Sequence, residues 1–212
     1  MTQSHSRKKG NFFVLEGIDG SGKSTQLSYL LTNLKKAGVF CHKTCEPTGG
    51  PAGAIIRQVL TGRIQMDDRA LAALFAADRL DHITNQADGV LKQIESGITL
   101  VSDRYYFSSY AYHSVDMPMD WVISANALAA QMLKPTCTFF IDIDPDLAME
   151  RIQKGRSHAE LYETRERLSL VRKLYFQAFE ALRETETIAI IDGSREPDIV
   201  AADIFNTAKS YL

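Results

Sequence analysis

Cysteine, long apolar runs and excess charge are all scarce in this chain of 212 residues. Its three cysteines are an odd number, which argues against a disulfide framework and fits a reducing cytoplasm. No apolar run approaches the roughly 18 residues that a membrane-spanning helix needs, so we expect no membrane association. The formal net charge of −2 offers nucleic acid no bulk electrostatic attraction, and no nucleic-acid partner is expected.

The first ten residues, MTQSHSRKKG, are polar and basic and lack the apolar segment of a signal peptide. We expect residues 1–10 to be a flexible tail and residues 11–212 to form one domain, because this length is typical of a single domain with its own core. With hydrophobic residues at 45% and charged residues at 24%, the composition is that of an ordinary globular protein. A cytoplasmic location is therefore predicted.

A phosphate-binding loop follows the first predicted strand. The strand Asn11 to Glu16 runs directly into GIDGSGKST, which fits the pattern G-x-x-x-x-G-K-[ST], and an amphipathic helix follows. Glycines at these positions allow successive N–H groups to line a concave anion site, and the start of the helix adds its positive dipole end. The loop predicts binding of a nucleoside triphosphate through Gly17, Ile18, Asp19, Gly20, Ser21, Gly22, Lys23, Ser24 and Thr25.

Within this loop, Lys23 is expected to reach the β- and γ-phosphates, and the Ser24 hydroxyl is expected to bind Mg²⁺. Asp103, at the end of a buried strand, is the predicted carboxylate for the same ion. Arg104 beside it has the planar fork that binds phosphate, although a salt bridge at the strand end is the alternative.

Strands and helices alternate along the chain, which predicts an α/β fold with a five-stranded parallel sheet flanked by helices. The predicted strands are 12–16, about 39–45, 98–102, 138–142 and 188–192. Cys41, His42 and Cys45 fit the second of these strands better than a metal site. Helices are expected at about 24–37, 53–61, 67–87, 88–96, 106–133 with a break near Pro118, 146–153, 163–183 and the C-terminus.

Two further segments are ambiguous from the residues alone. Phe75 and Arg79 lie four apart on one helix face and would suit a nucleobase, but spacing favours a core phenylalanine and a surface arginine. The basic linker from Arg151 to His158 is either a solvated surface or a lid that brings an arginine to a transferring phosphoryl group.

Taken together, these motifs resemble the thymidylate kinase family over about residues 11–210. The resemblance rests on the phosphate loop, Glu46-Pro47, Phe75 with Arg79, Asp103-Arg104-Tyr105 with Ser108, and the linker. It implies the P-loop nucleoside monophosphate kinase architecture, transfer of the γ-phosphoryl group of ATP to dTMP with Mg²⁺, and a homodimer.

The resemblance also implies roles for single residues. Asp19 would contact the 3′-hydroxyl of the acceptor, and Tyr112 would crowd its 2′ position. Phe75 would stack on thymine and Arg79 would bind its O4, while Arg57 and Arg104 would hold the acceptor phosphate. The phosphate loop has Gly20-Ser21 where some members carry an arginine, so the catalytic arginine is expected in a mobile lid near 151–162. Arg156 is the first choice for it and Arg151 the second.

Two departures from the family pattern affect the acceptor site. His113 stands where a Gln, Thr or Ser is expected near the thymine edge, although a neutral imidazole still donates or accepts one hydrogen bond. Thr48-Gly49-Gly50 replaces the commoner Pro-Gly-Gly order.

Three alternative functions remain to be weighed. Another P-loop kinase would differ in its acceptor, and Phe75, Arg79 and Tyr112 favour dTMP. A GTPase switch would carry an N-K-x-D guanine motif, which the sequence lacks. A nucleotide binder without catalysis is disfavoured, because Asp19, Lys23, Ser24 and Asp103 are all present.

Overall fold

The strands form one fully parallel sheet in the computed structural model, which describes residues 8–155 and 164–212. The order across the sheet is β2-β3-β1-β4-β5. The bounds are β1 Phe12–Glu16, β2 Cys41–Cys45, β3 Thr99–Asp103, β4 Cys137–Asp142 and β5 Ile188–Asp192. Since β1 lies at the centre, the loop that follows it begins at the middle of the carboxyl edge. The predicted α/β sheet is confirmed.

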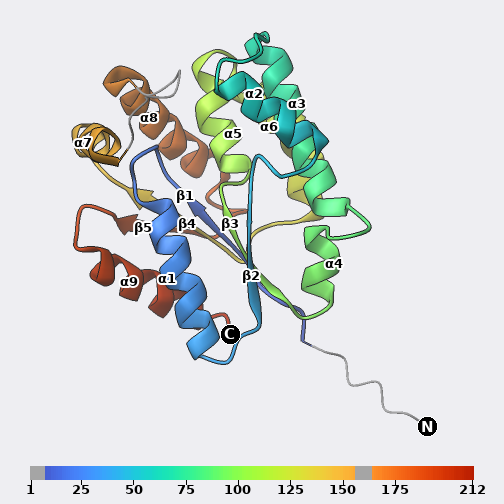
Figure 1. The fold of residues 1–212 in the computed structure, drawn as a ribbon, viewed down its shortest axis with the longest axis vertical. Helices are drawn as coiled ribbons and strands as arrows, with labels where there is room; N and C mark the ends of the chain where they lie inside the picture. The colour runs from blue at the N-terminus through green and yellow to red at the C-terminus, as the bar shows by residue number, and fades with distance from the viewer. Residues whose placement is uncertain (1–7, 156–163) are drawn as a thin grey trace.

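Helices cover both faces of the sheet (Figure 1). They are α1 Lys23–Lys36, α2 Pro51–Leu60, α3 Asp68–Thr84, α4 Val90–Glu95, α5 Tyr106–Tyr112, α6 Met119–Met132, α7 Pro145–Gly155, α8 Arg165–Leu182 and α9 Pro197–Lys209, with a 3₁₀ turn at His113–Val115. The predicted break near Pro118 separates α5 from α6, because proline fixes φ and starts the next helix. No helix among the described residues is long and apolar enough to cross a membrane.

The alternation of side chains along β1 divides the core in two. Phe12 and Val14 pack with the helices α4, α5, α6 and α8, whereas Phe13 and Leu15 pack with α1 and α9. Strand β1 is fully buried on both faces, as expected for a central parallel strand. A third, smaller cluster joins α2 to α3. These contacts fix the helices around the carboxyl edge of the sheet.

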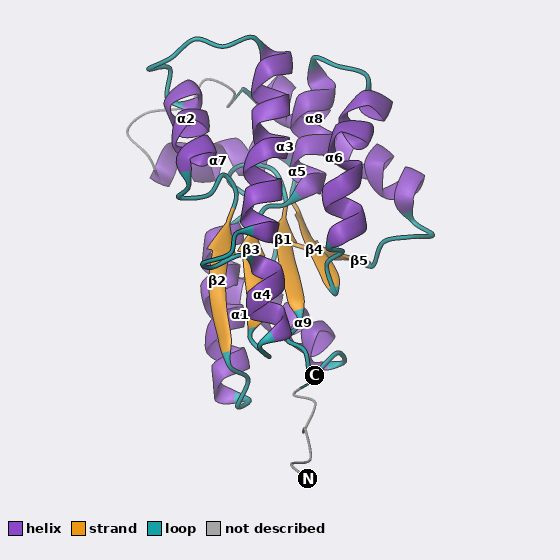
Figure 2. Cartoon of the chain, turned by 90° about the vertical axis from the view of Figure 1, so that its right-hand side faces the viewer, coloured by secondary structure: helices purple, strands orange, loops and turns teal. Residues whose placement is uncertain are grey.

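The start of β1 and the C-terminus lie at the end of the molecule opposite to α2 (Figure 2). Gly10 already donates its N–H to the carbonyl oxygen of Ile94 at 2.9 Å, and Lys8 Nζ donates to the carbonyl oxygen of Leu212 at 2.6 Å. The chain is thus in contact with the domain from Lys8 onward, and the rest of the predicted tail, residues 1–7, lies outside the described residues.

Candidate active site

The loop from Gly17 to Gly22 joins β1 to α1. Gly20 and Gly22 have positive φ values of 78° and 92°, in the left-handed region that costs a residue with a side chain about 1–2 kcal/mol. A Cβ on Gly20 would also lie 2.5 Å from the carbonyl oxygen of Ala148. These backbone angles give the loop the concave shape in which N–H groups bind anions at a helix N-terminus.

Lys23 is buried under this loop, and its ammonium group contacts the backbone of the loop. Its Nζ donates hydrogen bonds to the carbonyl oxygens of Gly17 at 3.0 Å and Ile18 at 2.9 Å. Burial, together with the charge of Arg104, lowers the pKa of Lys23 to about 8 against the opposing effect of Asp19. A bound phosphate would place negative charge beside this ammonium group and would favour its protonated form.

Ser24 and Asp103 lie together at the start of α1 and the end of β3. The Ser24 hydroxyl donates to Asp103 Oδ2 at 3.3 Å. Asp103 Oδ1 is buried and accepts no hydrogen bond within the described residues, although buried polar atoms normally have partners. One hydroxyl and one carboxylate oxygen with a lone pair still available suit Mg²⁺, which takes oxygen ligands and retains several waters.

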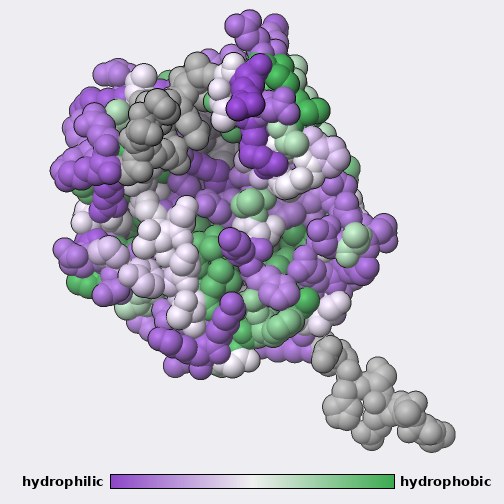
Figure 3. All heavy atoms as spheres, viewed as in Figure 1, coloured by the Kyte–Doolittle hydropathy of each residue, from purple (hydrophilic) through white to green (hydrophobic). Residues whose placement is uncertain are grey.

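A cavity of about 410 Å³ opens beside the loop, a size common for small-molecule sites. In the space-filling view the surface is hollowed between the α2 end and the α7 side, and hydrophilic residues surround the hollow (Figure 3). All the residues predicted to bind the acceptor line this cavity, namely Asp19, Arg57, Phe75, Arg79, Arg104, Ser108, Tyr112 and His113.

The guanidinium of Arg104 lies at the side of the cavity that adjoins the loop. It pairs with the Asp19 carboxylate and donates to Ser108 Oγ at 3.0 Å and to the carbonyl oxygen of Gly17 at 3.3 Å. The Tyr112 hydroxyl donates to the other Asp19 oxygen at 2.8 Å. The predicted phosphate-binding arginine and the predicted sugar-binding aspartate are therefore held next to each other before any ligand binds.

The backbone of Arg104 is unusual, because its φ of 70° is the only positive value at a non-glycine residue in the described ranges. Its N–H donates to the carbonyl oxygen of Leu15 at 3.0 Å, and the Ser102 hydroxyl donates to its carbonyl oxygen at 2.7 Å. Glu16 accepts from the N–H of Tyr105 at 2.8 Å. These bonds on both sides of the residue hold a conformation that costs about 1–3 kcal/mol.

Glu16 itself is a buried carboxylate that the sequence analysis did not select. Besides the N–H of Tyr105 it accepts from the N–H and the hydroxyl of Ser108, at 3.1 and 2.6 Å, and from the Tyr175 hydroxyl at 2.9 Å. Burial raises its pKa, and the charge of Arg104 and these donors oppose that effect. A charged residue at the end of an otherwise apolar strand was the signal that could have identified it.

The position of Arg79 shows that the interpretation favoured by spacing, a core Phe75 and a surface Arg79, is wrong. Its side chain is 1% exposed, whereas Phe75 is only partly buried, so the arginine is the core residue of the pair. Its Nε donates to Glu46 Oε2 at 2.8 Å, and Ser109 and Asn126 accept from Nη1. Helical periodicity predicted the shared face correctly but carries no information about the acceptors opposite it.

The loop after β2 is fixed by Asp78, whose side chain is buried. One carboxylate oxygen accepts the N–H of Thr48 at 2.7 Å and the other accepts its hydroxyl at 2.6 Å. Arg57 from α2 donates to the carbonyl oxygens of Pro47 and Thr48 and reaches the cavity from this loop. The threonine that departs from the family order therefore supplies a bond that proline cannot make.

We expect Thr48→Val to lower the free energy of unfolding by about 1–3 kcal/mol, because it leaves a buried carboxylate oxygen of Asp78 without its donor. Chemical denaturation with urea measures the change. Thr84→Val is the matched control, since that exposed hydroxyl only bonds back to the carbonyl oxygen of Leu80 in the same helix. A loss in Thr48→Val no larger than in Thr84→Val would contradict the assigned bond.

The rings of His113 and Phe75 are in contact, with centroids 5.0 Å apart and planes tilted by 57°. Burial lowers the pKa of His113 to about 3, and the positive charges of Arg79 and Arg167 add to the effect. The imidazole is therefore neutral at every pH near 7. It can offer the cavity one donor and one acceptor, as the sequence analysis expects.

This pKa has a consequence for stability. Between pH 6.5 and about 3 the unfolded chain binds a proton at His113 that the folded chain does not, so stability falls as pH falls through that window. The slope from this group is at most about 1.4 kcal/mol per pH unit. We expect His113→Gln to lose less stability than the parent between pH 7 and pH 5 in urea titrations. Identical slopes would show that folding does not lower the pKa of His113.

A second cavity, of about 200 Å³, lies on the other side of the phosphate loop. Arg151 of α7 lines it and donates to the carbonyl oxygen of Gly193 at 3.1 Å. The remaining lining residues come from the loop, from α1 and from the connection into α9, and they are Ser21, Gly22, Thr25, Gln26, Gly193, Arg195, Pro197 and Val200. Arg156 lies outside the described residues, as do residues 157–162 of the expected lid.

The sequence analysis missed several residues that the structure brings into these sites. Asp116 and Arg167, which form an ion pair at 3.0 Å, line the large cavity, and Arg195 lines the small one. Ser109 and Asn126 contact Arg79. Single polar residues on helices and in turns have no distinguishing sequence pattern, so only the tertiary structure identifies them.

Comparison with known proteins gives a consistent result. The sequence model of the family described as thymidylate kinase matches residues 15–204 of this chain. A protein of Pyrobaculum aerophilum named "Probable thymidylate kinase" is 36% identical, with 95% of this chain and 97% of that protein covered. Proteins named "Thymidylate kinase" from Leptospira borgpetersenii and Ligilactobacillus salivarius are 32% and 31% identical, over 92% and 96% of this chain and 92% and 100% of their own.

Proposed function

This chain belongs to the thymidylate kinase family, and from that premise we propose that it transfers the γ-phosphoryl group of ATP to dTMP, forming dTDP and ADP. One observation carries the proposal beyond the family. Two cavities lie on either side of a single phosphate loop, and the larger contains every residue expected for the acceptor. A donor and an acceptor in these two cavities would meet over Lys23 and Arg104.

On the donor side, the N–H groups of the loop and Lys23 would bind the phosphates of ATP. The rest of the nucleotide would occupy the smaller cavity, which Arg151 and Arg195 line. Mg²⁺ would be held by Ser24 and Asp103, since a buried carboxylate oxygen that accepts no hydrogen bond from the described residues fits a cation ligand. When bound, the ion neutralises charge on the phosphate oxygens.

On the acceptor side, Arg57 and Arg104 would hold the phosphate of dTMP, with Ser108 supporting Arg104. Asp19 would contact the 3′-hydroxyl and Tyr112 would crowd the 2′ position. Phe75 would stack on the thymine, with Arg79 and His113 at its edge. His113→Gln is expected to keep or improve dTMP use, because glutamine also offers a donor and an acceptor.

The chemistry requires positioning and positive charge more than proton transfer. The second pKa of a phosphate monoester is near 6, so the acceptor oxygens are largely anionic at pH 7 and no general base is needed. Two polyanions must approach in line while charge spreads over the transferring group. Lys23 on the donor and Arg57 with Arg104 on the acceptor would reduce their repulsion.

A lid over 151–162 would complete the site and exclude water, which otherwise competes for the phosphoryl group. We assign the catalytic arginine to Arg156 first and to Arg151 second. Arg156→Ala should lower kcat far more than it raises KM for dTMP, because the contact would form mainly in the transition state. If Arg151→Ala showed this loss of kcat and Arg156→Ala did not, the catalytic arginine would be Arg151.

The deciding experiment is ADP formation with ATP, Mg²⁺ and a panel of nucleoside monophosphates at one concentration. We expect strong turnover with dTMP, weaker turnover with dUMP and negligible turnover with AMP or GMP. If only a different monophosphate were turned over, the phosphoryl-transfer reaction would still be supported. The base- and sugar-binding roles of Phe75, Arg79 and Tyr112 would be rejected.

A homodimer is proposed as well. Helix α6 exposes Trp121, Leu128 and Met132 along one face, an apolar surface that a second copy of the chain would cover. Leu128→Glu should then convert a dimer to a monomer in sedimentation experiments, and an unchanged mass would reject this face.

The free cysteines Cys41, Cys45 and Cys137 support a reducing compartment such as the cytoplasm, which localisation of a tagged chain would test.

A further inference from the structure

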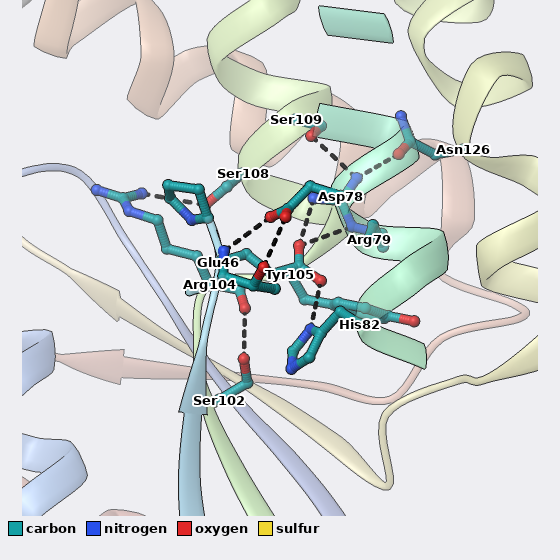
Figure 4. A network of polar contacts seen from close by, with 12 residues as sticks. Glu46, Asp78, Arg79, His82, Ser102, Arg104, Tyr105, Ser108, Ser109 and Asn126 are labelled. Atoms are coloured by element: carbon teal, nitrogen blue, oxygen red, sulfur yellow. Dashed lines mark hydrogen bonds and ion pairs between the residues drawn. The ribbon is translucent and has the colours of Figure 1, made fainter. Parts of the chain in front are cut away.

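The guanidinium of Arg79 is fixed by acceptors from three separate elements. Glu46, in the loop after β2, accepts a hydrogen bond from Nε at 2.8 Å and forms an ion pair with Nη2, whose nitrogen lies 2.6 Å from the same carboxylate oxygen. Ser109 of α5 accepts from Nη1 at 3.1 Å, and Asn126 of α6 accepts from the same nitrogen. Figure 4 shows Arg79 between these groups, with Glu46 on one side and Ser109 and Asn126 on the other.

An arginine carries five N–H donors, and three of them make hydrogen bonds in this network. Glu46 accepts the Nε–H, while Ser109 and Asn126 accept from Nη1. The ion pair of Nη2 with Glu46 directs one N–H of that nitrogen toward the carboxylate. Within the described ranges the second Nη2–H has no acceptor among these bonds, and Arg79 lines the large cavity. The cavity is therefore offered a single hydrogen-bond donor from a guanidinium that cannot rotate freely.

The acceptors are themselves held in one orientation. The Nδ2 of Asn126 donates to the carbonyl oxygen of Val122 at 2.8 Å, so reversing the amide would break that bond and place a donor against Arg79. His82 contacts the other oxygen of Glu46 at 3.0 Å and lies 2.5 Å from Thr44 Oγ1 through its second ring nitrogen. Asn126, Ser109 and Glu46 are all buried.

We propose that Asn126 and Ser109 are positioning residues for nucleobase selection, which hold Arg79 so that its one remaining donor faces the base. This inference rests on the proposed use of dTMP. A single fixed N–H can donate a hydrogen bond to a carbonyl oxygen at the edge of the base. It cannot bond to an amino group in the same place, because two donors would then face each other in a desolvated site. Asn126 and Ser109 thereby favour binding of thymine over cytosine, which carries an amino group at the corresponding position.

The test compares kcat and KM for dTMP and dCMP in the parent and in four variants. Asn126→Ala should raise KM for dTMP about tenfold and leave kcat within about threefold, since loss of a hydrogen bond to a charged group changes binding by this order. The preference for dTMP over dCMP should fall about tenfold in kcat/KM. Asn126→Asp keeps the acceptor oxygen and should retain the preference.

Ile123→Ala is the matched control, because it trims a core-packed side chain of the same helix, and Ile123 takes part in none of the hydrogen bonds described above for Arg79 and Asn126. It should lower the melting temperature and leave KM and base preference unchanged. If Asn126→Ala does not fold, Ser109→Ala provides the same comparison and should also lower the preference. Variants of Asn126 and Ser109 that lose stability but keep the parent's KM and preference would overturn the proposal.

Failure of the proposed function has a different signature. A parent protein without turnover of dTMP would reject the dTMP reaction before any variant is compared. A parent that turns over dTMP together with variants of unchanged preference would reject only the positioning roles.

Discussion

Lys23→Ala should remove phosphoryl transfer almost entirely, with kcat reduced by at least about 10²–10³. The ammonium group is buried directly beneath the loop, and its acceptors among the described residues are the carbonyl oxygens of Gly17 and Ile18. It is therefore available to the β- and γ-phosphates at the point where charge develops. Steady-state ADP formation measures the loss, and activity above about a tenth of the parent would contradict the role.

The same variant should not be less stable than the parent. The pKa of Lys23 is lowered from 10.5 to about 8, mainly by burial, which corresponds to about 3 kcal/mol of disfavoured charge in the folded protein. Because the unfolded chain binds more protons between pH 8 and 10.5, the parent gains stability as pH rises through that window and carries the full cost below it. Removing the group removes this cost.

Lys36→Ala is the control, since Lys36 is exposed in the last turn of the same helix. We expect it to keep the parent's kcat and to show no stability gain at pH 7. A Lys23→Ala protein that is inactive and also much less stable than the parent would indicate that the ammonium group holds the loop together instead of binding phosphate.

The sheet and the phosphate loop could be predicted because their signals are local. An apolar run such as Phe12 to Leu15, followed by a glycine loop and an amphipathic helix, carries its own period and its own turn residues. The alternation of such units then restricts the architecture to a parallel sheet with helices on both faces. All five strands accordingly appear within about two residues of their expected bounds.

The polar contacts around the acceptor cavity could not be predicted in this way. Whether Arg79 is exposed depends on Glu46, Ser109 and Asn126, which lie in three other segments of the chain. Spacing predicts which face a side chain shares but not what lies opposite, and a charged residue is buried only when its partners are present. The positive φ of Arg104 has the same origin, since no local signal distinguishes it from an ordinary strand end.

Arg104→Ala should lower kcat/KM for dTMP by about 10³ while KM for ATP changes by less than about threefold. The guanidinium is the group that joins the phosphate loop to the acceptor cavity, through Asp19, Ser108 and the carbonyl oxygen of Gly17. Without it, the acceptor phosphate loses a cation close to the transferring group, and repulsion between the two substrates is no longer offset. Kinetics with each substrate varied in turn measure both quantities.

Comparison with Arg104→Gly separates the side chain from the backbone. Alanine keeps the cost of a φ of 70°, whereas glycine adopts that angle freely, so the glycine variant should be more stable than the alanine variant by about 1 kcal/mol. Both lack the guanidinium and should lose the same activity. If glycine restored activity, the loss in Arg104→Ala would come from distortion of the loop. If instead the two variants were equally stable and equally inactive, the bonds from Ser102, Leu15 and Glu16 would not be holding Arg104 in a strained conformation, and the role of the guanidinium would stand alone.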